Sequence, residues 1–211
     1  MLAAVIDALA ACTSVAREAR LATPPLRIAV ALSGGRDSMV LLDALAEVAP
    51  ANGVVLGAVH VHHGLSPNAG AWAEFCAAEC ARRGVPLTVH EVVVERGEGA
   101  GPEAAARDAR YRVFEAVDAD FVALAHHADD QAETLLLQLM RGAGPHGLAA
   151  MPALHARRVG PALLRPFLAL PATAIEAHAK ARGLAWIDDE SNADVALRRN
   201  FLRHEIAPRL A

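Results

Sequence analysis

Short apolar segments alternate with longer segments of helical spacing along most of this chain. Apolar runs at residues 27–32, 54–63, 86–94 and 119–127 are each followed by residues whose apolar positions recur three or four apart. Short apolar runs bounded by turns are typical of buried parallel strands, and their alternation with helices indicates a doubly wound sheet. We therefore predict an α/β fold with a doubly wound, mainly parallel sheet of about five strands and flanking helices. The fifth strand is expected within residues 159–170, where prolines argue against a central position.

The composition predicts one globular domain in a reducing compartment. Apolar residues make up 54% and charged residues 21% of the 211 residues, so the chain can bury a core. Residues 1–24 are predicted to form an amphipathic N-terminal helix, because Asp7 and the lack of a basic start argue against a signal peptide. Cys12, Cys76 and Cys80 suit buried packing better than disulfides or zinc. With no run of the ~18 apolar residues that span a bilayer, we expect a cytoplasmic protein without a membrane partner.

Charge is unevenly distributed along the chain. Residues 1–140 carry ten arginines against eighteen acidic residues, whereas residues 141–211 carry ten basic against six acidic residues. The basic C-terminal third is suited to docking phosphates, although ordinary surface charge explains the same count equally well. The weakly acidic total, −4, argues against a dedicated nucleic-acid coat.

The turn Ser-Gly-Gly-Arg-Asp-Ser, residues 33–38, directly follows the first apolar run. Gly34 and Gly35 permit a close backbone approach, and successive N–H groups at the start of a helix form an anion cradle. Ser33 and Ser38 add hydroxyl donors, and Asp37 is placed to begin the helix or to act near a metal-bound phosphate. A plain tight turn with a capped helix is the alternative. The sequence fits neither the Walker A motif nor the dinucleotide fingerprint.

The turn resembles the signature loop of the PP-loop, or N-type, ATP pyrophosphatases. Those enzymes cleave ATP between its α and β phosphates, adenylate a substrate oxygen and release pyrophosphate. The resemblance implies that Ser33, Gly34, Gly35, Arg36, Asp37 and Ser38 bind ATP. It also implies an adenine-nucleotide alpha-hydrolase-like fold.

Four further motifs narrow the resemblance to the tRNA(Ile)-lysidine synthetase family. They are VHVHHGL (59–65), GPEAAARDARYRVF (101–114), LAHHADDQAETLLLQLMRGAGPHGLAAMP (124–152) and DDESNADVALRRNFLRHEI (188–206). The resemblance covers roughly residues 25–210 and implies a catalytic domain over residues 25–211 that ends in a basic tail. Many members continue into a region that binds tRNA, which we expect to be absent here, and homodimers occur in the family.

The segment HHADDQAE places two histidines and three acids at the expected carboxyl end of a strand, 119–127, which is where ligands bind in such sheets. Asp129 and Glu133 are four residues apart and Asp130 and Glu133 three apart, so either aspartate can meet Glu133. Acids in a first helical turn also favour the helix dipole, which is the structural alternative. We predict that Asp129, Asp130 and Glu133, together with Asp37, are catalytic. They hold Mg²⁺ on ATP, with Asp37 and Asp130 as ligands, or they bind the lysine ammonium.

Two groups of histidines, at 60–63 and at 126–127, are predicted to contact ATP or substrate. His60, His62 and His63 follow one another along a strand, and packing with nucleotide contact is favoured over a metal site. The resemblance implies ATP contacts for His63 and His126. It implies a substrate contact for His127.

The remaining predicted site residues are basic or lie beside basic residues. Glu103, Arg107 and Arg110 share a helix with Tyr111. A solvated arginine face is the alternative on spacing alone, and the resemblance implies that these three residues contact substrate. Arg199 is predicted to be catalytic. Asn200 and Arg203 are predicted to bind substrate, since arginine suits ATP phosphates or a tRNA backbone, and Asp188, Asp189, Ser191 and Asn192 precede them as a capped turn.

The family resemblance implies a reaction in two steps. The C2 oxygen of the wobble cytidine of an isoleucine tRNA with a CAU anticodon attacks the ATP α-phosphate. The lysine ε-amine then attacks C2 and expels AMP, which leaves lysidine. The cofactors are ATP and Mg²⁺, and the partners are the tRNA and L-lysine. Alternatives are another PP-loop tRNA-modifying enzyme, such as a 2-thiocytidine synthetase, or a non-catalytic ATP-binding module; the former typically carries CxxC pairs, which this chain lacks.

Overall fold

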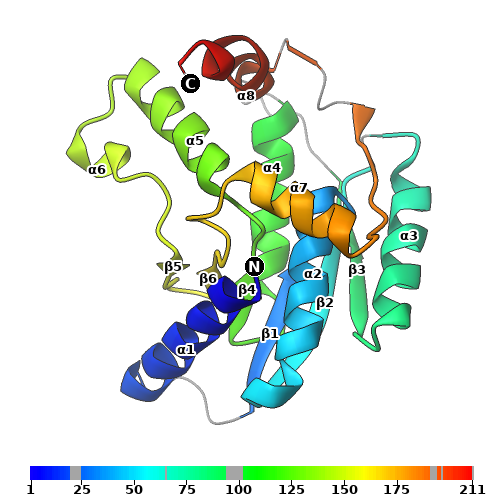
Figure 1. Ribbon diagram of the computed structural model, residues 1–211. Coiled ribbons are helices and arrows are strands. Elements are labelled where there is room, and N and C mark those ends of the chain that lie inside the picture. The colour runs from blue at the N-terminus through cyan, green and yellow to red at the C-terminus, as the bar shows by residue number, and fades with distance from the viewer. Residues whose placement is uncertain (20–24, 65, 94–101, 191–193, 196, 211) are drawn as a thin grey trace.

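The computed structural model confirms the predicted α/β architecture and adds one strand to it (Figure 1). It describes residues 1–19, 25–64, 66–93, 102–190, 194–195 and 197–210. The sheet has the order β3-β2-β1-β4-β6-β5, with every pairing parallel except that of β5 with β6. The strands are β1 (Leu26–Ala31), β2 (Val54–His62), β3 (Leu87–Glu91), β4 (Phe121–Ala123), β5 (Leu154–His155) and β6 (Ala162–Leu164).

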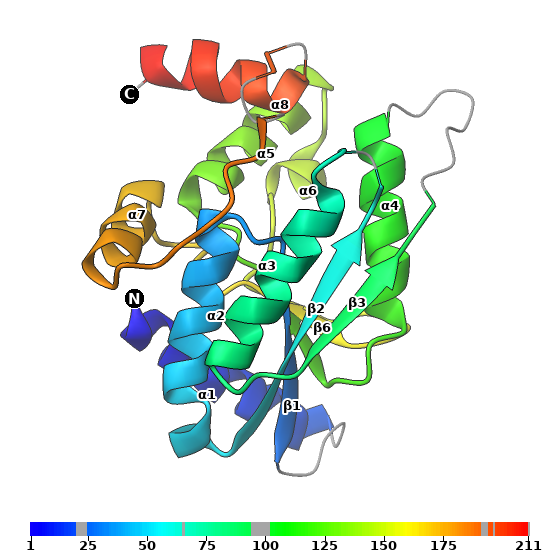
Figure 2. The ribbon, with the colours of Figure 1, turned by 90° about the vertical axis from the view of Figure 1, so that its right-hand side faces the viewer.

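Helices cover both faces of this sheet. They are α1 (Leu2–Ala19), α2 (Arg36–Val48), α3 (Ala69–Arg82), α4 (Pro102–Glu115), α5 (Ala128–Met140), α6 (Pro145–Leu148), α7 (Ala172–Ala181) and α8 (Arg198–Phe201). Side chains of α1, α2, α3 and α7 share one apolar core, while Phe114 of α4 packs into a second one with Val122 and Leu163. Figure 2 shows α3 and α4 on opposite sides of β2 and β3. The chain therefore changes face between β3 and β4, which puts a topological switch point between β1 and β4.

Several predicted boundaries differ from the observed ones. The fourth strand was predicted to run to residue 127, but it ends at Ala123. His126 and His127 therefore lie in the connection to α5. The sixth strand, β5, was not predicted because two residues are too few to show alternation. The connection between α5 and β5 contains the single turn of α6.

Helix α1 packs one apolar face on the core. Val5, Leu9 and Cys12 are fully buried against the core that includes α2, while Ile6 is 43% exposed. Burial of Cys12 and Cys76 raises the pKa of each thiol to about 12, so both stay protonated and pack as small apolar groups. No helix within the described ranges is both long and apolar enough to span a membrane.

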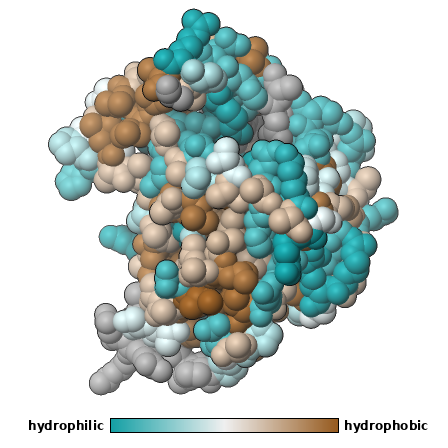
Figure 3. Space-filling model, viewed as in Figure 1, coloured by the Kyte–Doolittle hydropathy of each residue, from teal (hydrophilic) through white to brown (hydrophobic). Residues whose placement is uncertain are grey.

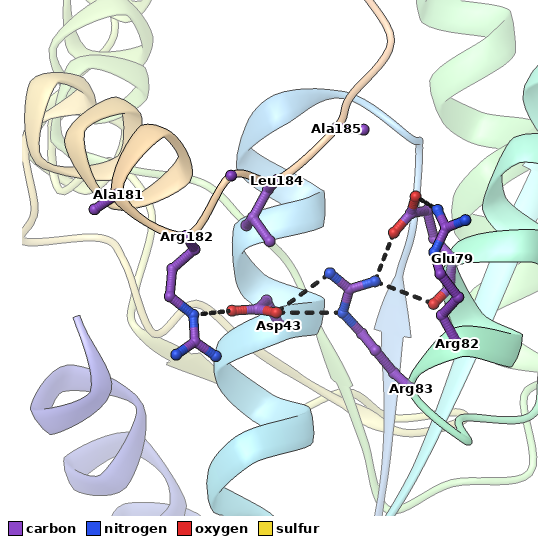
Figure 4. Close-up of a pocket in the computed structure, with 9 residues that line it drawn as sticks. Asp43, Glu79, Arg82, Arg83, Ala181, Arg182, Leu184 and Ala185 are labelled. Carbon is purple, nitrogen blue, oxygen red and sulfur yellow. Dashed lines mark hydrogen bonds and ion pairs between the residues drawn. The ribbon is translucent and has the colours of Figure 1, made fainter.

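An ion-pair network ties three helices together on the outer side of α2 (Figure 4). Asp43 of α2 accepts hydrogen bonds from Arg83, just beyond α3, and from Arg182, just beyond α7. Arg83 also pairs with Glu79 at 2.6 Å. These charges line a shallow surface pocket with Leu184 and Ala185. Each arginine of the pocket pairs with Asp43 or Glu79, so these ion pairs join the ends of α3 and α7 to α2. We call this group of ion pairs the clasp of Asp43.

Candidate active site

The turn at residues 33–38 connects β1 to α2 at the carboxyl edge of the sheet. Ser38 donates from Oγ to the Gly35 carbonyl at 2.9 Å, and its hydroxyl lies 3.1 Å from that of Ser33. The Gly35 N–H points back to the Ser33 hydroxyl at 3.3 Å. The turn is thus closed by its own serines at the N-terminus of a 13-residue helix, where backbone N–H groups and the helix dipole favour an anion.

Gly34 is the one residue of this turn that geometry restricts to glycine. Its φ of +88° is rarely adopted by L-residues, and a Cβ there would lie 2.6 Å from the Ile187 Cδ1 atom. Ile187 also donates its N–H to the Gly34 carbonyl at 2.9 Å. A segment 153 positions further along the chain therefore packs directly on the turn, and the sequence carries no local signal of that contact.

His127 brings the turn and α5 together. Its imidazole Nε2 lies 3.5 Å from a carboxylate oxygen of both Asp37 and Asp130, and its Nδ1 lies 3.4 Å from Asp129. Burial acts to raise the pKa of Asp37, but hydrogen bonds from His127 and Arg36 outweigh it and hold that pKa below its usual value. Conversely, burial acts to lower the pKa of His127, and the three aspartates outweigh it and raise the pKa. The pair is stabilised as imidazolium and carboxylate.

The acidic pair on α5 is Asp130 with Glu133. Glu133 is 3% exposed and accepts from Arg199 Nε and Arg203 Nε, each at 2.6 Å. Asp130 accepts from Arg199 Nη2 at 3.0 Å and from the backbone N–H of His127. Of the two aspartates that could meet Glu133, it is therefore Asp130, three residues before it, that shares its arginine partner. Asp129 is instead exposed, and its carboxylate accepts from the first N–H of α7, that of Ala172.

A second group of predicted residues lies on the α4 side of the same edge. The Nδ1 atoms of His63 and His126 are buried there and have no hydrogen-bond partner among the described residues. Burial and the nearby arginines lower the pKa of His63 to about 4 and that of His126 to about 3. Both imidazoles are therefore neutral at physiological pH, whereas the pKa of His127 is shifted in the opposite direction.

Tyr111 is the centre of the arginines on this side. Arg107 stacks over the ring with its Cζ 4.9 Å from the centroid and donates to the phenol oxygen at 3.3 Å. The Arg157 Cζ lies 5.8 Å from the same centroid. Arg165, just after β6, is only 5% exposed, and Tyr111 and Arg107 both affect its protonation. Arg157 and Arg165 were not predicted; the available signal was a charged residue directly after a short buried strand.

The other predicted residues have less defined places. Asn200 is buried and donates to the Asp194 carbonyl at 3.0 Å. His60 is buried 2.8 Å from the Leu32 carbonyl and 3.6 Å from the Cys76 sulfur, so it packs, as predicted. Ser191 and Asn192 lie outside the described residues, as does the side chain of Glu103. Arg110 lies on the exposed side of α4.

Within the described ranges, no three side chains of the metal-binding types gather as a metal site. Both oxygens of Asp130 are already engaged, by the His127 N–H and by Arg199. Asp37 is more available, because its side chain is 32% exposed beside the glycine turn. A metal ion at this edge therefore needs oxygens from a bound ligand in addition to Asp37.

Comparison with known proteins identifies the domain. Residues 11–210 match the family model described as the PP-loop domain. The chain belongs to the PP-loop domain family. Its glycine turn at the end of β1 occupies the place in the sheet where such a loop is expected.

Several of the most similar proteins share one name, tRNA(Ile)-lysidine synthase. A tRNA(Ile)-lysidine synthase of Chromobacterium violaceum is 56% identical over 182 residues, which cover 86% of this chain and 42% of that protein. The protein of the same name from Azoarcus sp. is 50% identical, with 88% of this chain and 42% of the relative covered. The chain thus spans about two fifths of the length of these relatives.

Solved structures share the PP-loop fold at low sequence identity. The U34-tRNA thiolase NcsA of Methanococcus maripaludis superposes with a TM-score of 0.74 at 18% identity, over 89% of this chain and 67% of that one. An NH3-dependent NAD synthetase of Campylobacter jejuni gives a TM-score of 0.50 at 17% identity, over 95% and 84% of the two chains. These likenesses support the fold.

Proposed function

We propose that this PP-loop domain catalyses the ATP-dependent ligation of L-lysine to C2 of the wobble cytidine of tRNA(Ile) with a CAU anticodon. The reaction passes through an adenylated tRNA and releases pyrophosphate and AMP. Similarity to the tRNA(Ile)-lysidine synthases supports it. The observation that carries it is the meeting, at one sheet edge, of an anion-binding turn and a buried pair of carboxylates, through the contacts of His127 with Asp37 and Asp130.

The glycine turn is proposed to hold the pyrophosphate portion of ATP. Amides of Gly34 and Gly35, the hydroxyls of Ser33 and Ser38, and Arg36 face the charge that grows as the α–β bond breaks. Asp37 is positioned to share a Mg²⁺ ion with the phosphates, which need such charge neutralisation. Asp130 fits this role less well than we predicted, because its oxygens are occupied.

The pair formed by Asp130 and Glu133 is proposed to bind the lysine ammonium. Buried carboxylates attract a cation strongly, since water no longer screens them. Arg199 and Arg203 hold the two carboxylates in place and complete the pocket from the C-terminal segment. The amine has to lose a proton before it attacks C2. The imidazole of His126 is neutral at this edge, but its pKa of about 3 makes it too weak a base for that step, so it fits a hydrogen-bonding role instead.

The target base is proposed to enter from the α4 side. An anticodon loop presents unstacked bases that can be splayed into a pocket. Arg107 and Arg110 lie on α4, where Glu103 also falls, and His127, Asn200 and Arg203 border the acidic pair. A homodimer remains a prediction.

The test is incorporation of labelled lysine into this tRNA with ATP and Mg²⁺, each omitted in turn. Incorporation that requires all components, with one AMP and one pyrophosphate per lysine, is the expected result. AMP transfer to the tRNA without a need for lysine would instead favour another PP-loop tRNA-modifying enzyme. Absence of AMP, together with tight binding of Mg-ATP, would reduce the domain to a nucleotide-binding module. Because the chain spans 42% of its relatives, a longer relative serves as the positive control.

A further inference from the structure

The three arginines around Tyr111 carry more positive charge than their surroundings neutralise. Arg157 pairs with Glu115 at 2.5 Å. For Arg107 and Arg165, the described part of the chain offers no ion pair. Arg165 donates from Nη1 to the Pro152 carbonyl at 2.8 Å, while its Nε and the Nη1 of Arg157 are buried without a partner.

A buried cation without a counter-ion is costly, and a native protein seldom keeps one without a use. Arg165 is 5% exposed, and burial lowers the pKa of its guanidinium. The neighbouring imidazole of His126 supplies no negative charge, because an imidazole is either neutral, as here, or cationic. An anionic ligand would supply the missing charge and accept from the unpaired N–H groups.

The location separates this cluster from the phosphate-binding turn. Arg165 and Tyr111 lie on the face of the sheet that α4 covers, where Phe114 and Leu163 form the second core. The glycine turn leads into α2 on the opposite face. Arginine binds phosphate through its planar guanidinium, and sites for single-stranded nucleic acid combine such basic groups with aromatic side chains.

We infer that Arg107, Arg157 and Arg165 form, around Tyr111, a binding site for one phosphodiester of the RNA substrate close to its target nucleotide. This inference rests on the proposed function, in that it takes RNA to be the substrate. Arg107 forms the outer edge of the site, and the more buried Arg157 and Arg165 form its wall.

The experiment measures binding of a labelled seven-nucleotide RNA loop with CAU at its centre to the full chain. In a matched set of loops, one phosphodiester at a time is replaced by an uncharged methylphosphonate. The variants are Arg157→Met and Arg165→Met, with Arg158→Met as a control that removes an exposed neighbouring charge. The Arg157 variant guards against loss of folding in the Arg165 variant, and circular dichroism checks both.

The expected result is one methylphosphonate position that weakens binding to the unaltered protein about tenfold. The same position should cost the Arg157 and Arg165 variants less than twofold, while Arg158→Met behaves like the unaltered protein. Equal losses of affinity for a methylphosphonate at every position would overturn the inference. So would the absence of RNA binding at up to about 100-fold excess of protein over labelled RNA. The inference would also be overturned if the Arg157 and Arg165 variants lost affinity for Mg-ATP alone, because the arginines would then bind the nucleotide and not the RNA. No step needs lysine or turnover, so failure of lysine transfer is scored separately.

Discussion

At the scale of single residues, the candidate site depends on side chains whose surroundings, and not whose types alone, define their chemistry. His126 and His127 are adjacent, yet burial among arginines keeps the first neutral, and three aspartates raise the pKa of the second. The pKa values of two adjacent histidines are thus shifted in opposite directions within one edge of the sheet. Sequence reasoning placed both residues in the site and could not tell their charges apart.

The first prediction concerns Gly34. Gly34→Ala forces a Cβ into Ile187 and places alanine at φ +88°, so we expect loss of most Mg-ATP binding and a stability loss of about 3 kcal/mol. Calorimetric titration and urea unfolding measure the two effects. Gly84→Ala is the matched control, because its φ is also positive at +64° but open space surrounds its Cβ. That variant should lose only ~1 kcal/mol and keep its ATP affinity. Equal effects of the two substitutions would mean that the Ile187 contact is unimportant.

The second prediction concerns Glu133. Glu133→Gln removes the charge that would bind the lysine ammonium, so lysine transfer should fall by about 100-fold or more, while adenylation of the tRNA continues. Filter-binding assays with labelled lysine and with labelled ATP separate the two steps. Glu205→Gln serves as the control, since that carboxylate is 49% exposed and 4.0 Å from its arginine. A parallel loss of both steps would remove Glu133 from lysine binding.

The third prediction concerns acid stability. The folded-state pKa of His126, about 3, lies below its usual value of 6.5, so the unfolded chain takes up a proton first as the pH falls. Stability from this group is therefore complete above pH 6.5 and is lost toward pH 3, at up to about 1.4 kcal/mol per pH unit. His126→Asn should flatten that slope in urea unfolding between pH 6.5 and 5. An unchanged slope would place the acid sensitivity elsewhere; His127, whose pKa is raised, acts only as the pH rises through its folded value.

At the scale of elements, the helices are held to the sheet by apolar packing and to one another by charges. The alternation of apolar runs predicted β1 to β4 and their helices, because buried parallel strands are continuous and apolar. It did not predict β5, nor the end of β4 at Ala123, since tertiary pairing and not propensity decides those. The motifs predicted the turn and the α5 acids, whereas the contacts of Ile187, Arg157 and Arg165 join distant segments and leave no local pattern.

The fourth prediction concerns the clasp of Asp43. Asp43→Asn weakens contacts to Arg83 and Arg182 at a largely buried position, so the free energy of unfolding should fall by about 1–3 kcal/mol. Glu47→Gln, which loses one pair on a 40% exposed side chain, should cost less than ~0.5 kcal/mol. Chemical unfolding measures both variants. Because the clasp lies away from the glycine turn, Mg-ATP affinity should not change, and a large change would show that the pocket communicates with the site.

At the scale of the whole molecule, the last segments of the chain complete a site that the first strands begin. Figure 1 shows the C-terminal helices above the sheet, next to α5, and Arg199 and Arg203 reach the α5 acids from there. Leu135, Leu139 and Met140 leave an apolar area over α5, as the brown surface at the upper left of Figure 3 shows. The site therefore needs the C-terminal segment to fold against α5 and the turn that follows β1.

The fifth prediction follows from this shared folding. Trp72 lies in α3, and Trp186 lies in the segment that packs on Gly34. Single-tryptophan proteins, Trp72→Phe and Trp186→Phe, should unfold with the same urea midpoint when followed by fluorescence. Mg-ATP should change the emission of Trp186 and leave that of Trp72 nearly unaltered. Unfolding of the Trp186 segment at lower urea would show that it docks as an independent unit.

The guanidinium groups on the α5 acids have a consequence for selectivity. Before any amino acid binds, Arg199 and Arg203 already satisfy Asp130 and Glu133. If these acids bind the lysine ammonium as proposed, the incoming side chain has to share or displace the two arginines, so its apparent affinity is reduced by the strength of the internal pairs. A neutral side chain such as that of glutamine offers too little in exchange. Under this proposal, selection of a cationic amino acid arises from its competition with Arg199 and Arg203 for the two carboxylates, in addition to any selection by side-chain length.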